Sequence, residues 1–321
     1  MNDRSGSDEA SGSTATRDPT SEPPANEPNP ATAESDRTTT GESDRTTTGE
    51  SEPTTTDDAD PETVRRWAIL CGLLGVATLL VALATGVQGP IGEAIGAAVL
   101  GCAFVGVAVL GPRRAPGALQ ALANGWAEHR RYTGGAAGLF FLGVAGGLAL
   151  GATGVNLLQL ITEVTGQDPF AGIEESDLTA WWFVQNNTIP FLVSIAGAVS
   201  LGLLSAYVIG FNGLLVGNVV WFTGGLVGVD YILVGLLPHG IFELTALFVA
   251  AGVGFRIVHR LVARITGRRE AFVTRAYLRR TAALVVFAWF LLVLAAFVET
   301  YVTSPLLETV FAERLEGLET A

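Results

Sequence analysis

The sequence contains no lysine, so arginine supplies all 19 of its basic side chains. It has only two cysteines, Cys71 and Cys102, and both lie in apolar runs, where we expect them to pack as small hydrophobic residues. Three histidines and two cysteines form no cluster with zinc-ligand spacing, and no HExxH pattern, nucleotide-binding loop or activated nucleophile is present. These absences predict a protein that is not an enzyme and that has no catalytic residues, no cofactor and no metal.

The net negative charge of the chain arises entirely at one end. Residues 1–63 carry the whole net charge of -12, whereas the remaining residues hold equal numbers of acidic and basic side chains. An acidic tail repels phosphate and the arginines are spread over several short stretches, so we expect no nucleic-acid binding. The acidic tail and the lack of lysine are a compositional bias that indicates a halophile.

Residues 1–63 are predicted to be a disordered tail rich in serine and threonine. They have no apolar periodicity and cannot bury enough surface to offset the loss of chain entropy on folding. An eight-residue sequence that begins at Ser35 is repeated from Ser43, and we interpret it as part of a solvated spacer rather than as a docking or phosphorylation site. No signal peptide is expected, because the first apolar run begins only near residue 67.

The rest of the chain is strongly apolar. A mean hydropathy of +0.42 is too high for an ordinary soluble domain of this length, and several runs are long enough to cross a bilayer. We therefore predict an all-α, polytopic transmembrane helix bundle with about seven spans. The expected spans are residues 67–87, 91–110, 134–161, 188–211, 214–229, 232–258 and 281–302.

Glycine and proline mark where these spans should pack or end. Gly92 and Gly96 have the four-residue spacing that permits close helix contact. Gly143, Gly147 and Gly151 repeat that spacing and predict a packing face. Asn212-Gly213 indicates a turn between the fourth and fifth spans. Pro238 could begin a fresh helix, which would leave residues 231–237 as a re-entrant or interfacial segment.

Arginine-rich stretches set the expected orientation of the protein in the cell membrane. The stretches at 65–66, 111–133 and 256–280 should all face the cytoplasm, and seven alternating spans satisfy this condition. The N-terminus is then cytoplasmic, and the C-terminus lies outside. Within the last stretch Arg256, Arg260 and Arg264 step by four, which predicts a helix anchored in the cytoplasmic headgroup layer.

Polar groups inside an apolar span are costly and need an explanation. His239 and Glu243 are four residues apart, so they share one face of a helix and could form a hydrogen bond. They could be a structural clamp between helices, a proton or ion relay, or half of a metal site. We favour the clamp over the relay, and the metal site is the least favoured because the HExxH signature with its two histidines is absent. The candidate polar site comprises Asn186, Asn187, Asn212, Gly213, Pro238, His239, Gly240, Glu243 and Glu299.

Several of these residues lie in longer strings that carry a resemblance. The strings are Asn186-Asn187, Asn212-Gly213-Leu214-Leu215-Val216-Gly217, Pro238-His239-Gly240-Ile241-Phe242-Glu243 and Ala295-Ala296-Phe297-Val298-Glu299. Together they resemble the stage II sporulation protein M family of integral membrane proteins. The chain departs from the family pattern at Thr245-Ala246, where Pro-Ala is expected.

The resemblance implies a five-span core over residues 134–311. A two-span hairpin with a cytoplasmic loop, residues 64–133, would precede it, and a short tail, residues 312–321, would follow. In spore formers the family member acts beside stage II sporulation proteins D and P, which cut peptidoglycan, and it resembles a scaffold rather than a hydrolase. Family members also occur in organisms that neither sporulate nor have peptidoglycan.

Two functions remain open at the level of sequence. The first is a non-enzymatic membrane scaffold that positions envelope partners in the lipid bilayer. The second is a permease-like transporter subunit that uses His239 and Glu243 and is served by a separate ATPase subunit. An intramembrane enzyme is disfavoured, because no second catalytic group is spaced to assist Glu243.

Overall fold

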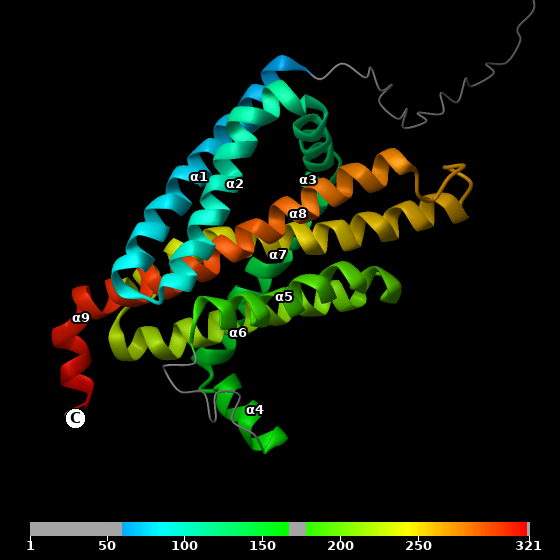
Figure 1. The fold of residues 1–321 in the computed structure, drawn as a ribbon. Coiled ribbons are helices and arrows are strands. Elements are labelled where there is room, and N and C mark those ends of the chain that lie inside the picture. Colours follow the sequence, from blue (N-terminus) through cyan, green and yellow to red (C-terminus); the bar gives the residue numbers. More distant parts are fainter. Residues whose placement is uncertain (1–59, 167–177, 320–321) are drawn as a thin grey trace, which may run out of the picture. The chain divides into compact units, whose positions relative to one another are not determined.

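The computed structural model describes residues 60–166 and 178–319, with side chains described as far as Arg314. These residues belong to one compact unit, and the predicted disordered tail lies outside them apart from its last four residues. All regular elements of the described residues are helices, as predicted (Figure 1). They are α1 (Pro61–Gln88), α2 (Ile91–Arg114), α3 (Pro116–Ala152), α4 (Leu157–Thr165), α5 (Ala180–Ala196), η2 (Gly197–Ser200), α6 (Leu203–Val227), α7 (Val229–Ile265), α8 (Arg275–Val298), η3 (Glu299–Thr303) and α9 (Ser304–Glu319).

Six helical stretches in the described part of the chain are long and apolar enough to cross a membrane, which identifies a multi-pass membrane protein. Five are α1, α2, α3, α6 and α7, and the sixth is the stretch from Arg275 to Arg314, which comprises α8, η3 and most of α9. The sequence predicted about seven membrane spans. The difference is α5, whose 17 residues extend only about 26 Å, less than the roughly 30 Å of a bilayer core.

The first helix begins where the acidic tail ends. Asp60 caps α1 by accepting hydrogen bonds from the backbone N–H groups of Glu62 and Thr63, and Pro61 occupies the first helical position. The hydrogen bond from the Thr63 side chain, supported by that from its backbone, lowers the pKa of the Asp60 carboxyl. The predicted tail boundary at residue 63 is therefore a few residues too late.

The predicted turn at Asn212-Gly213 is wrong. Helix α6 continues through both residues, and the chain reverses earlier, at Leu201 and Gly202, which adopt positive φ values of 56° and 87°. The side chain of Asn212 forms a hydrogen bond within the helix, because its Nδ2 donates to the Val208 carbonyl at 2.8 Å. Gly213 is required for close packing rather than for a turn, since an added Cβ would overlap the carbonyl oxygen of Phe140 on α3.

Two other predicted breaks are also absent. Helix α7 passes through Pro238, so residues 231–237 belong to the span and are not a separate re-entrant segment. Proline is tolerated within membrane helices, because neighbouring groups can satisfy the carbonyl that it leaves free. The stretch 111–133 was expected to be a loop, but α3 begins at Pro116 and buries Leu119 and Leu122 one turn apart.

Glycine packs α3 against α6. An added Cβ at Gly147 would overlap the Leu214 carbonyl oxygen, and one at Gly217 would overlap that of Val144. The predicted packing face of Gly143, Gly147 and Gly151 is therefore confirmed. The glycines predicted in α2 are not those that contact α1. An added Cβ at Gly92 would meet nothing within 4 Å, whereas Gly75 and Gly101 mediate the α1–α2 contact.

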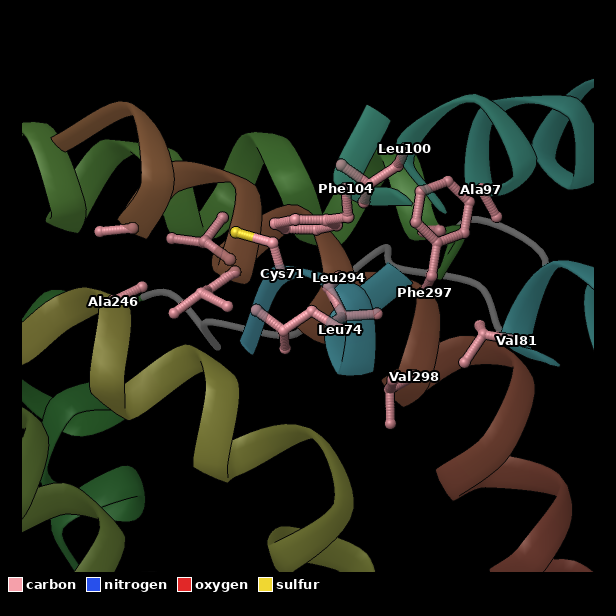
Figure 2. Close-up of a cluster of buried hydrophobic side chains, with 14 of the residues drawn as sticks. Cys71, Leu74, Val81, Ala97, Leu100, Phe104, Ala246, Leu294, Phe297 and Val298 are labelled. Carbon is pink, nitrogen blue, oxygen red and sulfur yellow. The ribbon is translucent and has the colours of Figure 1, made fainter. Parts of the chain in front are cut away.

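The largest apolar core lies where α1 and α2 meet α8. Figure 2 shows Cys71 and Leu74 of α1 beside Phe104 of α2 and Leu294 of α8. Cys71 is a free, buried thiol and packs as the small hydrophobic residue that the sequence predicted, whereas Cys102 is exposed. Helices α7 and α8 lie side by side (Figure 1), and α7 carries His239, Glu243, Arg256 and Arg260, which are discussed below.

Candidate functional site

A compact polar cluster joins α7 to the π-helical turn η3. His239 and Glu243 lie one turn apart on α7, and Glu299 and Thr303 are the first and last residues of η3. The Nε2 atom of His239 lies 3.9 Å from Glu299 Oε1, and its Nδ1 atom lies 3.3 Å from Thr303 Oγ1. One ligand atom from each of His239, Glu243 and Glu299 lies within 4.8 Å of the other two.

The local backbone explains how these groups meet. The spacing of four residues places His239 and Glu243 on one face of α7, as predicted. At the end of α8 the helix widens into η3, and Ser304 Oγ donates to the Glu299 carbonyl oxygen at 3.1 Å. Single π-helical turns of this kind are frequent at functional sites, because they change the direction in which side chains point.

The cluster is poor in compensating positive charge. His239 is 8% exposed, and the Glu299 side chain is 21% exposed, so both lie largely out of solvent. In the described residues no arginine forms an ion pair with Glu243 or Glu299, and His239 is the one basic partner of Glu299. Two neighbouring carboxylates in such surroundings must gain a proton or a cation, because a buried unpaired charge costs several kcal/mol.

The structure brings together three of the predicted site residues and separates the others. Pro238 and Gly240 flank His239 on α7, and Gly213 lies in the contact between α3 and α6. Asn186 is exposed and Asn187 half-buried on α5, and within the described part of the chain no hydrogen bond links either to the cluster. The sequence analysis did not identify Thr303, whose only sequence signal is its place four residues after Glu299.

A second polar cluster lies near the other end of α7, and the sequence analysis missed it. Glu128 of α3 accepts hydrogen bonds at 3.1 Å from both Arg256 and Arg260. These arginines are 5% and 1% exposed, so their side chains contact protein groups of α3 instead of pointing freely into the headgroup layer, as the sequence had led us to expect. Arg264, one turn further along, is exposed.

Aromatic rings and a backbone carbonyl complete this second cluster. Arg256 donates to the Tyr132 hydroxyl at 3.0 Å, and Arg260 donates to the Phe272 carbonyl at 3.0 Å. The Arg260 guanidinium also lies 3.9 Å from the centre of the Tyr277 ring, a cation–π distance. Had residues 116–133 been recognised as helical, the one-turn spacing of Glu128 and Tyr132 would have indicated this partner face.

A third polar contact fixes the end of α3 to α6. The side chain of Asn218 is buried, and its Oδ1 accepts a hydrogen bond from the Leu157 backbone N–H at 2.8 Å. Its Nδ2 donates to the Val155 carbonyl at 2.9 Å. One amide thus holds the connection between α3 and α4 against α6.

Comparison with known proteins agrees with this architecture. A family model described as "Stage II sporulation protein M" matches residues 136–304, which is more than half of the chain and includes the whole polar cluster on α7 and η3. The chain belongs to the stage II sporulation protein M family. The resemblance noted in the sequence is thereby confirmed, and the family is not a known enzyme family.

The chain is also similar to a protein of Methanocaldococcus jannaschii. This uncharacterized protein is 29% identical over 123 residues, which is 37% of this chain and 67% of that protein. No solved structure matches the chain.

Proposed function

We propose that this member of the stage II sporulation protein M family is a non-enzymatic membrane scaffold that positions other membrane or envelope proteins. The observation that carries the proposal is the use of buried charge: Glu128, Arg256 and Arg260 are paired with one another across α3 and α7. Buried charged groups of a membrane protein can mark a transport pathway when they are left unpaired. These three pair with one another and join α3 to α7, which favours a rigid bundle that presents its outer faces to partners.

A rigid bundle is also supported by the other contacts between helices. Tyr301 donates to Glu93 at 2.6 Å and so ties η3 to α2, while Arg314 pairs with Asp230 at 2.9 Å and ties α9 to α7. Glycine lets α3 and α6 approach to backbone contact. A scaffold needs this property, because it presents several partners at fixed relative positions.

A second candidate function is a permease-like subunit served by a separate ATPase. It is favoured by the two carboxylates of Glu243 and Glu299, which lie close together within a membrane helix pair without an arginine partner in the described residues. Intramembrane acidic groups of this kind can relay protons or ions.

Partner recovery separates the two functions. We expect the tagged full chain, purified from native membranes in mild detergent, to retain an envelope or membrane protein in fixed ratio. Gly147→Ala should lose this partner because it disturbs the α3–α6 contact, whereas Gly138→Ala on an exposed face of α3 should keep it. Recovery of an ATP-binding subunit in fixed ratio would instead favour transport and overturn the scaffold proposal.

In the proposed orientation the N-terminus is cytoplasmic, and the C-terminus lies outside. Support comes from contacts that bring the arginine-rich stretches together: the Asp60 N–H donates to Gln120 Oε1 at 3.0 Å, and Glu128 pairs with Arg256 and Arg260. With these stretches on one side, α5 must complete a short seventh crossing. Helix α5 bonds to its neighbours along its length, through Thr188 to Trp289 of α8 and through Ser194 to Ser205 of α6.

Thiol labelling tests this orientation. In a background with both native cysteines replaced by alanine, Glu163→Cys should react with a membrane-impermeant reagent in intact cells. Glu270→Cys should react only after permeabilisation, because it lies between the arginines that follow α7. Both residues are exposed glutamates, so they form a matched pair. Labelling of both from the same side would refute the proposed topology.

A further inference from the structure

We propose that His239, Glu243 and Glu299 bind one divalent transition-metal ion between α7 and η3. The site uses a histidine nitrogen and two carboxylate oxygens from segments that are far apart in the sequence. This inference goes beyond the scaffold role and does not depend on it, since a metal that ties two helices together is compatible with either candidate function.

The positions of the three ligand atoms fit a metal ion after small side-chain rotations. In a tetrahedral site with metal–ligand distances of about 2.1 Å, ligand atoms lie about 3.4 Å from one another. The three candidate atoms lie within 4.8 Å of one another, and His239 Nε2 is 3.9 Å from Glu299 Oε1. A movement of about 1 Å in each side chain would therefore bring the three atoms to metal-binding distance and leave the fourth tetrahedral position open to water.

The other nitrogen of His239 has the partner that a metal-binding histidine requires. Its Nδ1 lies 3.3 Å from Thr303 Oγ1, so in the tautomer that carries its proton on Nδ1 the ring donates to this hydroxyl and its Nε2 lone pair is available to a metal ion. Metal-binding histidines nearly always donate their second N–H to an oxygen, which fixes the ring and the tautomer. Thr303 thus acts as a positioning residue rather than as a ligand.

Charge balance selects a divalent ion. When both carboxylates are ionised, the cluster carries two negative charges beside a neutral imidazole, and no arginine within the described part of the chain offsets them. One divalent cation makes the site neutral, whereas a monovalent cation leaves a net charge in surroundings of low dielectric constant. A metal ion would therefore stabilise groups that otherwise oppose the packing of α7 against η3.

Ligand chemistry narrows the choice of ion. One imidazole and two carboxylates suit Zn²⁺, Mn²⁺ or Fe²⁺, whereas Ca²⁺ and Mg²⁺ are bound by oxygen alone. Neither cysteine belongs to the cluster, so the thiolate ligands that select Cu(I) are absent from this site.

The site lies near one end of the helix pair, where an ion can enter. His239 and Arg256 are separated by 17 residues along α7, about 26 Å of helix, so the proposed metal site and the arginine cluster lie near opposite membrane boundaries. Two residues beyond Glu299, Tyr301 meets Gly89 in the connection between α1 and α2. Glu299 retains some exposure, which is consistent with access from this end.

Metal binding by the purified full chain tests the proposal directly. After treatment with a chelator, wild-type protein in detergent should bind about one Zn²⁺ or Co²⁺ per chain, and Mg²⁺ should not compete. Glu243→Gln and Glu299→Gln should weaken Zn²⁺ binding at least about tenfold. Glu308→Gln, an exposed glutamate on the neighbouring α9, should bind as wild type does.

Two outcomes would overturn the site: a wild-type chain that binds no Zn²⁺ or Co²⁺, or Glu243→Gln and Glu299→Gln variants that bind like Glu308→Gln. If the ligand variants fail to fold, X-ray absorption at the zinc edge of the zinc-loaded wild-type chain still tests the proposed site. The site requires nitrogen and oxygen ligands, including an imidazole. A spectrum with sulfur ligands or without imidazole refutes it. Partner recovery is measured in membrane extracts, so either proposal can fail without the other.

Discussion

Replacing Gly147 with alanine is expected to lower the free energy of unfolding by about 3 kcal/mol, at the upper end of the usual cost of overpacking. The added Cβ would overlap the carbonyl oxygen of Leu214 and would lie 2.7 Å from the backbone nitrogen of Asn218. Neither backbone atom can rotate away, so α3 and α6 must separate along their contact. Unfolding of the detergent-solubilised protein by heat or by denaturant would measure the loss.

Gly138 provides the matched control for this substitution. It lies on the same helix, and an added Cβ there would meet nothing within 4 Å. Because alanine favours helix more than glycine does, Gly138→Ala should be neutral or stabilising by up to about 1 kcal/mol. Equal stability of the Gly147→Ala and Gly138→Ala variants would show that α3 and α6 do not pack through their glycines.

Glu128→Gln is expected to cost about 3–5 kcal/mol, because it removes the one carboxylate that both Arg256 and Arg260 contact. The two arginines are almost fully buried and cannot reach water without moving α7 away from α3. A loss of this size should appear as a lower unfolding temperature and as a smaller yield of folded protein from the membrane.

Two controls separate lost pairing from a general effect of the substitution. Glu163→Gln removes an exposed glutamate of α4 and should leave the unfolding temperature unchanged. Replacing Glu128, Arg256 and Arg260 together by apolar residues of similar size should recover much of the stability lost in Glu128→Gln, because no unpaired charge then remains buried. If Glu128→Gln unfolds at the wild-type temperature, the buried cluster does not hold α3 to α7.

The polar site shows how far sequence reasoning reaches. Spacing along one helix placed His239 and Glu243 on a shared face, and the sequence included Glu299 in the candidate polar site, but it predicted no metal. Its grounds were the missing two-histidine signature, which describes ligands on a single helix. The proposed ligands come from α7 and η3, and Glu243 and Glu299 are 56 residues apart, a separation that carries no local sequence pattern.

The errors in the predicted fold also arise because local sequence patterns do not report the surroundings of a residue. Asn212-Gly213 and Pro238 have strong local preferences for turns and helix ends, yet both lie inside helices. In a membrane the helix is favoured because backbone groups lack water as an alternative partner, and this outweighs the preference of a single residue. The stretch around Glu128 was predicted to be a loop because of its arginines, although its apolar residues have helical spacing.

Hydrophobic run lengths by themselves determined that this chain is an all-α membrane protein, because only helices satisfy their own backbone groups within one segment in lipid. The four-residue spacing of particular residues also placed the packing glycines of α3 and the face shared by His239 and Glu243. Only the tertiary structure decided that Glu128 pairs with two arginines of α7 and that Glu299 and Thr303 meet His239. Such pairings depend on how far one helix is shifted along another, and that offset is set by side-chain packing over the whole contact.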